Sequence, residues 1–465
     1  MENFWCEGYH LRPPRGWLND PNGLCYFAGE YHVFHQYSPD WPKADAARGW
    51  GHYSSVDLVD WRHHGMVIKP ELAFEANGAY SGSAVVLPSA DKDVLHLYYT
   101  GNVKHPGDFD YIYNGREANQ VLIEVDSAGD IAEATKQLIL QEKDYPATLS
   151  QHVRDPKVWR DDERWWMLLG ARDLESRGLA LLYTSQNGRV WDLHCKLESA
   201  EPFGYMWECP DRIEIAGKEF LVFCPQGMEQ YPWSFGLRDQ SGYVPLGEGE
   251  KLSDAPIVDQ SAFTKWDYGF EFYAPQTFTD PKGRILLIGW LGLPIAPYES
   301  APAQAPWCHC LTVLREVQMN ARGKLVQRPV DELKQLRTER IAADVKVDAW
   351  SAESASHLVD LEITDLTGNF SLTLDAGLEL SYRDQTLELA FSDVELGLGR
   401  TVRSVHCSML SRLRILIDNS ALEIFVDDGE IVFSTRWFPL SQEKLKIEFK
   451  GTSSDPAIWQ MRSIY

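Results

Sequence analysis

Three acidic side chains stand among neighbours that suit acid–base or nucleophilic chemistry. They are Asp20 in the segment 17–23 (Trp-Leu-Asn-Asp-Pro-Asn-Gly), Asp155 in 154–156 (Arg-Asp-Pro) and Glu208 in 207–210 (Trp-Glu-Cys-Pro). Hydrolysis of a glycosidic bond needs two such groups, because one carboxylate attacks or activates water while a carboxylic acid protonates the leaving oxygen. The three residues are therefore candidates for a single site.

The residues around Asp20 predict a tight β-turn. Asp at the first position can bond the backbone ahead of it, Pro21 fixes φ, and Gly23 closes the turn. A carboxylate held in this way loses little freedom when a ligand binds, and Trp17 and Asn19 offer an aromatic plane and an amide for a sugar ring. The alternative is that Asp20 only caps a hairpin.

The neighbours of Glu208 and Asp155 suggest different protonation. Trp207 and Cys209 are apolar and would raise the pKa of Glu208, as a proton donor needs. Arg154 would keep Asp155 ionised, so that it could bind sugar hydroxyls and stabilise positive charge on the ring. The alternatives stay open: Glu208 could pair with a cation, and Asp155 could form a simple ion pair with Arg154.

The elements that carry these residues read as strands. The chain holds 17 Trp, 20 Tyr and 19 Phe, and helical periodicity is scarce, which predicts an all-β protein. Short β-type runs occupy 25–27, 31–35 and 51–55. Segments 54–61 and 184–191 resemble each other, each with a small polar strand end, a turn and a Trp, and they suggest a repeating unit.

Five polar motifs follow one another along the first two thirds of the chain. They stand at Asp20, 80–83, 154–156, 207–210 and 272–276, at intervals of 53–74 residues. Such intervals suit four-stranded blades with generous loops, so we predict a five-bladed β-propeller over residues 1–328, with all five motifs on one axial funnel. In the alternative, a large sandwich, the motifs would have no reason to meet.

A second domain follows. Pro329, Val330, Leu333 and Leu336 predict a short amphipathic linker helix over 329–340. Alternating runs at 357–363, 370–374, 413–418 and 423–426 predict a β-sandwich over 341–465. The residues of the predicted sandwich form no catalytic cluster. We therefore expect the sandwich to brace the propeller, in preference to binding carbohydrate.

Composition narrows the partners. The chain has 44 basic and 68 acidic residues, a net charge of −24, which disfavours nucleic acid or an anionic membrane as partner. No apolar run is long enough to span a bilayer, and the Asp20 motif leaves little room for a secretion signal, so a cytoplasmic protein is expected. The oligomeric state stays open, with a homo-oligomer among the options.

The sequence predicts neither a metal nor a cofactor. The eight cysteines form no CxxC pair and are expected to be reduced. Residues 308–310 (Cys-His-Cys) could suggest a metal, but alternating strand spacing without a second cluster fits packing better. The nucleotide-binding motifs and HExxH are absent.

A longer set of motifs points to one family. It comprises 17–23, 34–39 (Phe-His-Gln-Tyr-Ser-Pro), 50–52 (Trp-Gly-His), 80–83 (Tyr-Ser-Gly-Ser), 154–159 (Arg-Asp-Pro-Lys-Val-Trp), 206–211 (Met-Trp-Glu-Cys-Pro-Asp) and 270–277 (Phe-Glu-Phe-Tyr-Ala-Pro-Gln-Thr). With these motifs the chain resembles glycoside hydrolase family 32, and within it the bacterial sucrose-6-phosphate hydrolases and intracellular invertases. The resemblance covers nearly the whole chain and implies a five-bladed propeller followed by a sandwich.

The resemblance also implies an activity and roles. It implies a retaining β-fructofuranosidase that acts on sucrose, sucrose 6-phosphate or short fructooligosaccharides, with Asp20 as nucleophile, Asp155 as transition-state stabiliser and Glu208 as acid/base. The carboxyl groups of the nucleophile and the acid/base would then lie about 5–5.5 Å apart. The implied sugar-pocket residues are Asn19, Gln36, Trp50, Tyr80, Ser81, Arg154, Tyr273 and Trp290.

One interval departs from the family pattern. Many members carry a Trp-Gly pair before the Trp-Gly-His motif, whereas here residues 40–49 place Trp41 nearer the start and include Lys43 and Arg48. We hypothesise that Lys43 or Arg48 contacts a 6-phosphate of the substrate; the alternative is a solvated loop.

Two other functions are alternatives. A fructosyltransferase differs only in whether a sugar or water intercepts the intermediate, and the sequence does not separate the two. A non-catalytic sugar-binding propeller is disfavoured because all three carboxylates are present.

Overall fold

The computed structural model describes residues 4–89, 91–161, 164–229, 231–375, 377–440 and 444–465. The chain forms two compact units. We call Arg15–Lys265 with Tyr273–Gly289 the ring unit, and Met1–Pro14 with Trp266–Phe272 and Trp290–Tyr465 the sandwich unit. No helix among the described residues is both long and apolar enough to cross a membrane.

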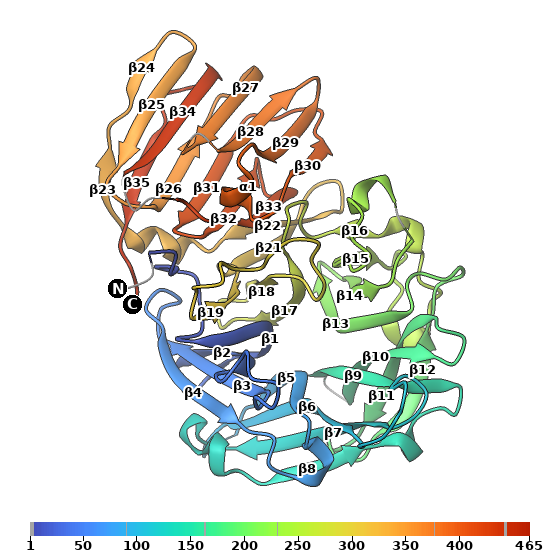
Figure 1. The fold of residues 1–465 in the computed structure, drawn as a ribbon. Coiled ribbons are helices and arrows are strands. Elements are labelled where there is room, and N and C mark those ends of the chain that lie inside the picture. Colours follow the sequence, from blue (N-terminus) through green and yellow to red (C-terminus); the bar gives the residue numbers. More distant parts are fainter. Residues whose placement is uncertain (1–3, 90, 162–163, 230, 376, 441–443) are drawn as a thin grey trace. The chain divides into compact units, whose positions relative to one another are not determined.

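The ring unit contains four consecutive antiparallel meanders, which run from blue to green in Figure 1. Their strands, in chain order, are β1 (Gly16–Phe27), β2 (Glu30–Ser38), β3 (Gly49–Ser55) and β4 (Arg62–Ile68); β5 (Ala79–Leu87), β6 (Val94–Lys104), β7 (Arg116–Val125) and β8 (Lys136–Leu140); β9 (Leu149–Arg160), β10 (Trp165–Asp173), β11 (Gly178–Ser185) and β12 (Asp192–Leu197); and β13 (Met206–Ile215), β14 (Lys218–Gln226), β15 (Gly242–Pro245) and β16 (Thr264–Lys265). Each strand pairs with the next one in its group, as β-type runs joined by short turns require.

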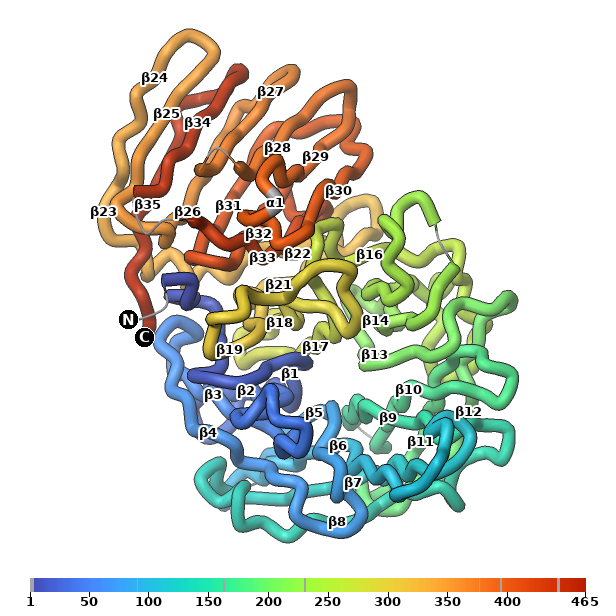
Figure 2. Tube along the Cα trace, viewed as in Figure 1, coloured from blue at the N-terminus to red at the C-terminus, as the bar shows by residue number. Residues whose placement is uncertain are grey.

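A fifth sheet begins with β17 (Tyr273–Thr279) and β18 (Ile285–Leu291). The first strands of the five sheets form a closed ring, because β1 contacts β5, β5 contacts β9, β9 contacts β13, β13 contacts β17, and β17 contacts β1. Figure 2 shows these strands around a common centre. The prediction of a five-bladed β-propeller is confirmed.

Apolar clusters between neighbouring sheets hold the ring unit together. One cluster packs Phe34 and Trp50 of the first sheet against Leu97 and Tyr99 of the second. Further clusters join the second sheet to the third and the third to the fourth. Each large side chain buried in this way contributes about 1.5–3 kcal/mol, so the contacts between sheets are a main source of stability.

The repeat predicted from segments 54–61 and 184–191 is confirmed. Ser55 Oγ accepts hydrogen bonds from the backbone N–H groups of residues 57 and 58, and Ser185 Oγ accepts them from residues 187 and 188. The third turn residue has positive φ in both, +66° at Leu58 and +71° at Gly188. The two turns join the last two strands of the first and third sheets, so the same local structure closes two blades.

The sandwich unit holds two antiparallel sheets, coloured orange to red in Figure 1. One has the order β23 (Arg337–Ile341), β35 (Ala457–Met461), β26 (Leu358–Ile363), β31 (Leu413–Asp418), β32 (Ala421–Val426), β33 (Ile431–Arg436). The other has the order β24 (Asp344–Lys346), β25 (Ala349–Ser354), β34 (Leu445–Thr452), β27 (Thr367–Leu374), β28 (Leu378–Arg383), β29 (Thr386–Phe391), β30 (Val402–His406). Alternating apolar residues of both sheets, such as Leu361, Ile415, Leu372 and Leu380, form one core, which confirms the predicted β-sandwich.

Short elements complete the chain. The sandwich unit also contains β19 (Trp307–Cys308), β20 (Cys310–Leu311), β21 (Arg315–Met319) and β22 (Leu325–Pro329). Short helices are η1 (Ala73–Glu75), η2 (Ala128–Glu133), η3 (Glu142–Asp144), η4 (Pro232–Ser234), η5 (Leu252–Asp254), η6 (Gln260–Ala262) and α1 (Val394–Gly397).

The linker segment 329–340 contains a 3₁₀-helix, η7 (Asp331–Leu336), with Leu333 and Leu336 buried as the amphipathic pattern predicts. The helix is short because β22 extends to Pro329 and β23 starts at Arg337. The domain limits 1–328, 329–340 and 341–465 stay predictions.

Candidate active site

The first strands of the five sheets bring the sequence motifs together. Asn19 and Asp20 lie on β1, Tyr80 and Ser81 on β5, Arg154 and Asp155 on β9, Glu208 on β13 and Tyr273 on β17. Asp155 stands at the middle of β9, and the other residues stand in the first half of their strands. Because these strands form a closed ring, the motifs converge at one end of it.

Irregular backbone marks the same positions. Pairing shifts between Leu18 and Pro21 on β1, between Ala79 and Gly82 on β5, and between Glu208 and Asp211 on β13. Bulges of this kind re-aim side chains. Asp155, Cys209 and Ala274 have φ of +64°, +46° and +46°, and each precedes a proline.

The prediction of a tight β-turn at residues 20–23 is therefore wrong. The segment is part of β1 and carries bulges there. The ladder is interrupted between Leu18 and Pro21 and again between Asn22 and Cys25, but the strand does not end, because β2 pairs with β1 on both sides of each interruption.

Both oxygens of Asp20 have donors. Ser81 Oγ donates to Oδ2 over 2.5 Å, and Asn19 Nδ2 donates to Oδ1 over 3.0 Å. Trp17 Nε1 donates to Asn19 Oδ1 over 3.1 Å, which fixes the amide. Limited contact with water raises the pKa of Asp20, while the bonds from Ser81 and Asn19 act in the opposite direction. The carboxylate is thus oriented in a poorly solvated position.

Glu208 is held by a cation and a hydroxyl. Arg154 Nη2 lies 2.6 Å from Oε1, and the hydroxyl of Tyr273 donates to Oε2 over 2.7 Å. The side chain is only 16% exposed. Glu208 is paired with a cation, as one of the two alternatives from the sequence had it, and the contacts with Arg154 and Tyr273 fix its carboxyl group.

Asp155 connects Asp20 and Glu208 through shared contacts. Its Oδ2 accepts the backbone N–H of Cys209 over 3.0 Å, and the Sγ of Cys209 lies 3.6 Å from Asp20 Oδ2. Burial raises the pKa of Asp155; Arg154, 3.9 Å away, lowers it, and Glu208 and Asp20 raise it further. The effect of Arg154 predicted from the sequence is present, but burial outweighs it. Asp155 thus shares Arg154 with Glu208 and Cys209 with Asp20.

Two predicted pocket residues hold the backbone of β5, the strand that carries Tyr80 and Ser81. Gln36 Nε2 donates to the carbonyl of Ala79 over 3.0 Å, and Trp50 Nε1 donates to the carbonyl of Tyr80 over 2.9 Å. Trp50 has no exposed surface. The expectation that Trp50 lines the pocket is thus corrected: it fixes the strand that carries Tyr80, since an indole inside the core cannot touch a sugar.

Trp290 belongs to the sandwich unit. It is buried, and its ring meets that of His309 edge to face with centroids 5.0 Å apart. Its role as a pocket residue stays a prediction.

The loop 40–49, which departs from the family pattern, contributes an aromatic ring. Trp41 packs against Trp17 with ring centroids 5.5 Å apart, so the displaced tryptophan reaches the neighbourhood of Asn19. Lys43 is 70% exposed and lies 4.0 Å from Asp40. The carbonyl of Arg48 accepts the N–H of Ala79 over 2.9 Å, next to Tyr80. Arg48 is therefore the better placed of the two basic candidates.

Sequence reasoning missed Cys209, His152 and Arg116. Cys209 contacts two of the carboxylates, and its place in the 207–210 motif could have indicated this. His152 accepts from Arg154 Nη1 over 2.8 Å and also contacts Arg116. No motif marks Arg116, because it comes from β7 and reaches the site only through the fold. In the described part of the chain, no group of three His, Cys, Asp or Glu residues could hold a metal ion.

Comparison with known proteins agrees with this geometry. The model of the glycosyl hydrolases family 32 N-terminal domain matches residues 10–329, and that of the family 32 C-terminal domain matches 332–460. The chain belongs to glycoside hydrolase family 32. The family assignment accounts for the order of propeller and sandwich.

Similar family 32 proteins come from several bacteria and an insect. The sucrose-6-phosphate hydrolase of Klebsiella pneumoniae is 38% identical over 443 residues, 93% of this chain and 88% of the relative. The solved sucrose-6-phosphate hydrolase of Lactobacillus gasseri has a TM-score of 0.85 at 28% identity and covers 100% of this chain, which covers 94% of it. A β-fructofuranosidase of Bombyx mori, solved with sucrose, has a TM-score of 0.81 at 26% identity, with 99% and 95% covered.

Proposed function

We propose that the chain is a retaining β-fructofuranosidase that releases fructose from sucrose or from sucrose 6-phosphate. The observation that carries the proposal is the meeting of Asp20, Asp155 and Glu208 on the ring of inner strands, where Asp155 shares Arg154 with Glu208 and Cys209 with Asp20. Support comes from the related family 32 proteins named sucrose-6-phosphate hydrolase, in Klebsiella pneumoniae and in Bacillus subtilis, the latter 34% identical over 452 residues.

In the first step, a carboxylate oxygen of Asp20 attacks the anomeric carbon of the fructosyl group. The bond from that carbon to the bridging oxygen breaks, and Glu208 gives its proton to this oxygen. The products are an ester between fructose and Asp20, and the free glucose or its phosphate. Asn19 and Ser81, which donate to the Asp20 oxygens, would orient the attacking carboxylate.

In the second step, Glu208 takes a proton from water while the water oxygen bonds to the anomeric carbon. The ester bond to Asp20 breaks and fructose leaves with its original configuration. Asp155 would stabilise the positive charge that develops on the ring in both steps. Arg154 and Tyr273 would hold Glu208 for both proton transfers. Interception by a second sugar in place of water would give fructosyl transfer, which product analysis distinguishes.

The test is direct. Purified protein is incubated with sucrose and with sucrose 6-phosphate, glucose and glucose 6-phosphate are measured, and Asp20→Asn is the control. We expect release from the wild type, a loss of at least about 10³-fold in Asp20→Asn, and β-fructofuranose as the first anomer seen by NMR. Undiminished activity in Asp20→Asn would remove the assigned nucleophile, and a lack of hydrolysis would contradict the proposal.

We also place the protein in the cytoplasm. None of the eight cysteines, all of which the structure describes, forms a disulfide, as expected for a reducing compartment. Fractionation of the native source followed by immunoblotting tests this location.

A further inference from the structure

Three basic side chains near Tyr80 have no carboxylate partner among the described residues. They are Arg48, Lys104 and Arg116, and none of them lies within 4.0 Å of a described Asp or Glu oxygen. The chain as a whole has 68 acidic and only 44 basic residues. In such a chain, three cations without carboxylate partners beside a candidate active site indicate a ligand that carries negative charge.

Two of the three stand directly opposite each other. Lys104 pairs with Arg116 in the register between β6 and β7. Like charges at this position destabilise a sheet. The next acidic side chain, Glu117, lies 2.7 Å from His105 and also accepts from Asn119. The strand pair therefore carries two positive charges that the protein does not neutralise locally.

Arg116 also has donors that the protein leaves unsatisfied. Its Nη1 lies 3.1 Å and 3.3 Å from the ring nitrogens of His152. The network assigns a proton to Nε2 of His152, which lies 3.0 Å from the carbonyl of Tyr111, and Nδ1 accepts from Arg154. His152 thus has no further lone pair for Arg116, and Nε of Arg116 is buried without a partner. Such a group is costly to bury unless a ligand completes it.

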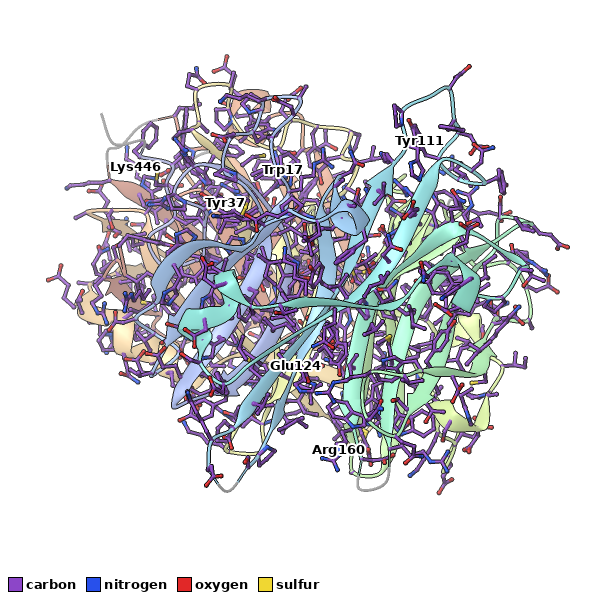
Figure 3. All side chains as sticks on the ribbon, turned by 90° about the horizontal axis from the view of Figure 1, so that it is seen from below. Trp17, Tyr37, Tyr111, Glu124, Arg160 and Lys446 are labelled. Atoms are coloured by element: carbon purple, nitrogen blue, oxygen red, sulfur yellow. The ribbon has the colours of Figure 1, made fainter. Side chains whose placement is uncertain are left out.

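Arg48 lies close to the other two. A Cβ built on Gly78 would meet the ring of Tyr80 at 3.1 Å and Cβ of Arg48 at 3.4 Å, so both side chains flank Gly78. Partial burial and the charges of Arg116 and Arg48 lower the pKa of Lys104. The Nζ of Lys104 also lies 5.4 Å from the ring centroid of Tyr111, which Figure 3 labels at the same end of the ring unit as Trp17.

The three cations lie on the Glu208 side of the candidate active site. Contacts run from Arg116 to His152, from His152 to Arg154, and from Arg154 to Glu208. In the proposed reaction Glu208 protonates the oxygen of the leaving sugar. A negative charge on the leaving half of the substrate would therefore face these cations.

We propose that Arg48, Lys104 and Arg116 bind a phosphate carried by the leaving sugar, so that the enzyme selects a phosphorylated disaccharide over the neutral one. This inference rests on the proposed function. Arginine offers a fork of donors for phosphate oxygens, and lysine adds a point charge. Together these groups bind a phosphate more strongly than one solvated lysine on a loop does. Lys43, already beside Asp40, is not needed.

The experiment compares kcat/KM for sucrose 6-phosphate and for sucrose in the wild type, Lys104→Gln and Arg116→Gln. The matched control is Lys92→Gln, an exposed lysine in the loop that joins β5 and β6, 3.2 Å from Asp126. We expect a wild-type preference for the phosphorylated sugar of at least about 10-fold. Lys104→Gln should lower kcat/KM for that sugar by about 3–10-fold and Arg116→Gln by about 10–100-fold, on the scale of charge-assisted hydrogen bonds. In Lys104→Gln the value for sucrose should stay within about 3-fold. Arg116 contacts His152, which contacts Arg154 of the active site, so for Arg116→Gln we expect only that the loss is larger for the phosphorylated sugar than for sucrose.

A binding measurement separates this inference from the proposed function. Glucose 6-phosphate and glucose are titrated calorimetrically into the wild type and Lys104→Gln. We expect only the phosphorylated sugar to bind detectably, and more weakly to the variant. Equal loss of activity on both sugars, or unchanged binding of glucose 6-phosphate in Lys104→Gln, would overturn the phosphate site. Absence of any hydrolysis would contradict only the proposed function, since the titration still decides the phosphate site.

Discussion

The hydroxyl of Ser81 donates a 2.5 Å hydrogen bond to Oδ2 of Asp20, across 61 residues of sequence. The two residues stand on the adjacent inner strands β5 and β1. Asn19 holds the other carboxylate oxygen. The position of the proposed nucleophile is therefore set by the contact between two blades and by its own chain neighbour.

Removal of the Ser81 hydroxyl should slow the reaction more than it weakens binding. Ser81→Ala leaves one oxygen of Asp20 without its strongest donor, so the carboxylate is less well oriented for attack. We expect kcat to fall by about 10–100-fold with KM changed by less than about 3-fold. Steady-state kinetics on the preferred sugar measures this. Ser127→Ala, which removes only an exposed helix cap, is the control, and equal kinetics in the two variants would count against the role of Ser81.

The role of Glu208 as proton donor can be separated from its role in binding. Glu208→Gln keeps a hydrogen-bonding group for Arg154 and Tyr273 but has no proton to give. We expect kcat for sucrose to fall by about 10³-fold or more. An aryl fructoside, whose leaving group needs little protonation, should form the enzyme ester at nearly normal rate in a burst experiment. A matched control is Glu214→Gln on the same strand, which removes a partly exposed partner of Arg212. Loss of the burst in Glu208→Gln would argue against the assignment.

The pH profile should reflect a poorly solvated carboxylate. Asp20 must be ionised to attack, and burial raises its pKa above the ordinary value of about 4. Activity should therefore fall, as pH is lowered, at a pH above that of a solvated aspartate. Measurement of kcat/KM from pH 3.5 to 7 checks this. An acidic limb centred at or below about pH 4 would contradict the environment described for Asp20.

The free energy of unfolding should fall as pH rises, whereas the activity should increase. Burial raises the pKa of Asp155 in the folded chain, so the folded state holds more protons than the unfolded state just above pH 4. Its free energy of unfolding then falls as pH rises. Asp155→Asn removes this loss, and its Tm should exceed that of the wild type by an amount that grows from pH 4 to pH 7, by about 1–4 °C. Asp130→Asn, an exposed aspartate in η2, should show no such trend, and a constant difference for Asp155→Asn would refute the argument.

The sequence predicted much of this arrangement for definite reasons. Strand runs, turn residues and the spacing of the five motifs indicated a ring of blades, since these signals are local or periodic. The positive φ values of Asp155, Cys209 and Ala274 were not predictable, because they depend on how neighbouring inner strands meet. Arg116 and His152 were missed because their contacts arise only when β7 and β9 come together. Trp50 was assigned to the pocket by its motif, which does not distinguish a ring that lines a site from one that supports it.

A buried ion cluster in the sandwich unit gives a separate prediction. His10 has no exposed surface; its Nδ1 lies 2.7 Å from Asp418 and its Nε2 lies 2.9 Å from Glu423. Asp418 also accepts the backbone N–H groups of Tyr9 and His10. Burial by itself would lower the pKa of His10, but the two carboxylates outweigh it and raise the pKa to about 9. Both ring nitrogens therefore donate, and His10 is charged in the folded chain at neutral pH.

The sign of the pH effect follows from this raised pKa. The stabilisation is fully present below about pH 6.5, where the unfolded histidine is also protonated, and it is lost as pH rises to about 9. A difference of this size corresponds to about 3 kcal/mol. In His10→Gln the titrating group is gone, so the excess Tm of the wild type over the variant should shrink between pH 6.5 and 9. Calorimetry across that range measures it, with the exposed His194→Gln as control. Parallel Tm curves for the wild type and His10→Gln would show that His10 does not carry the charge.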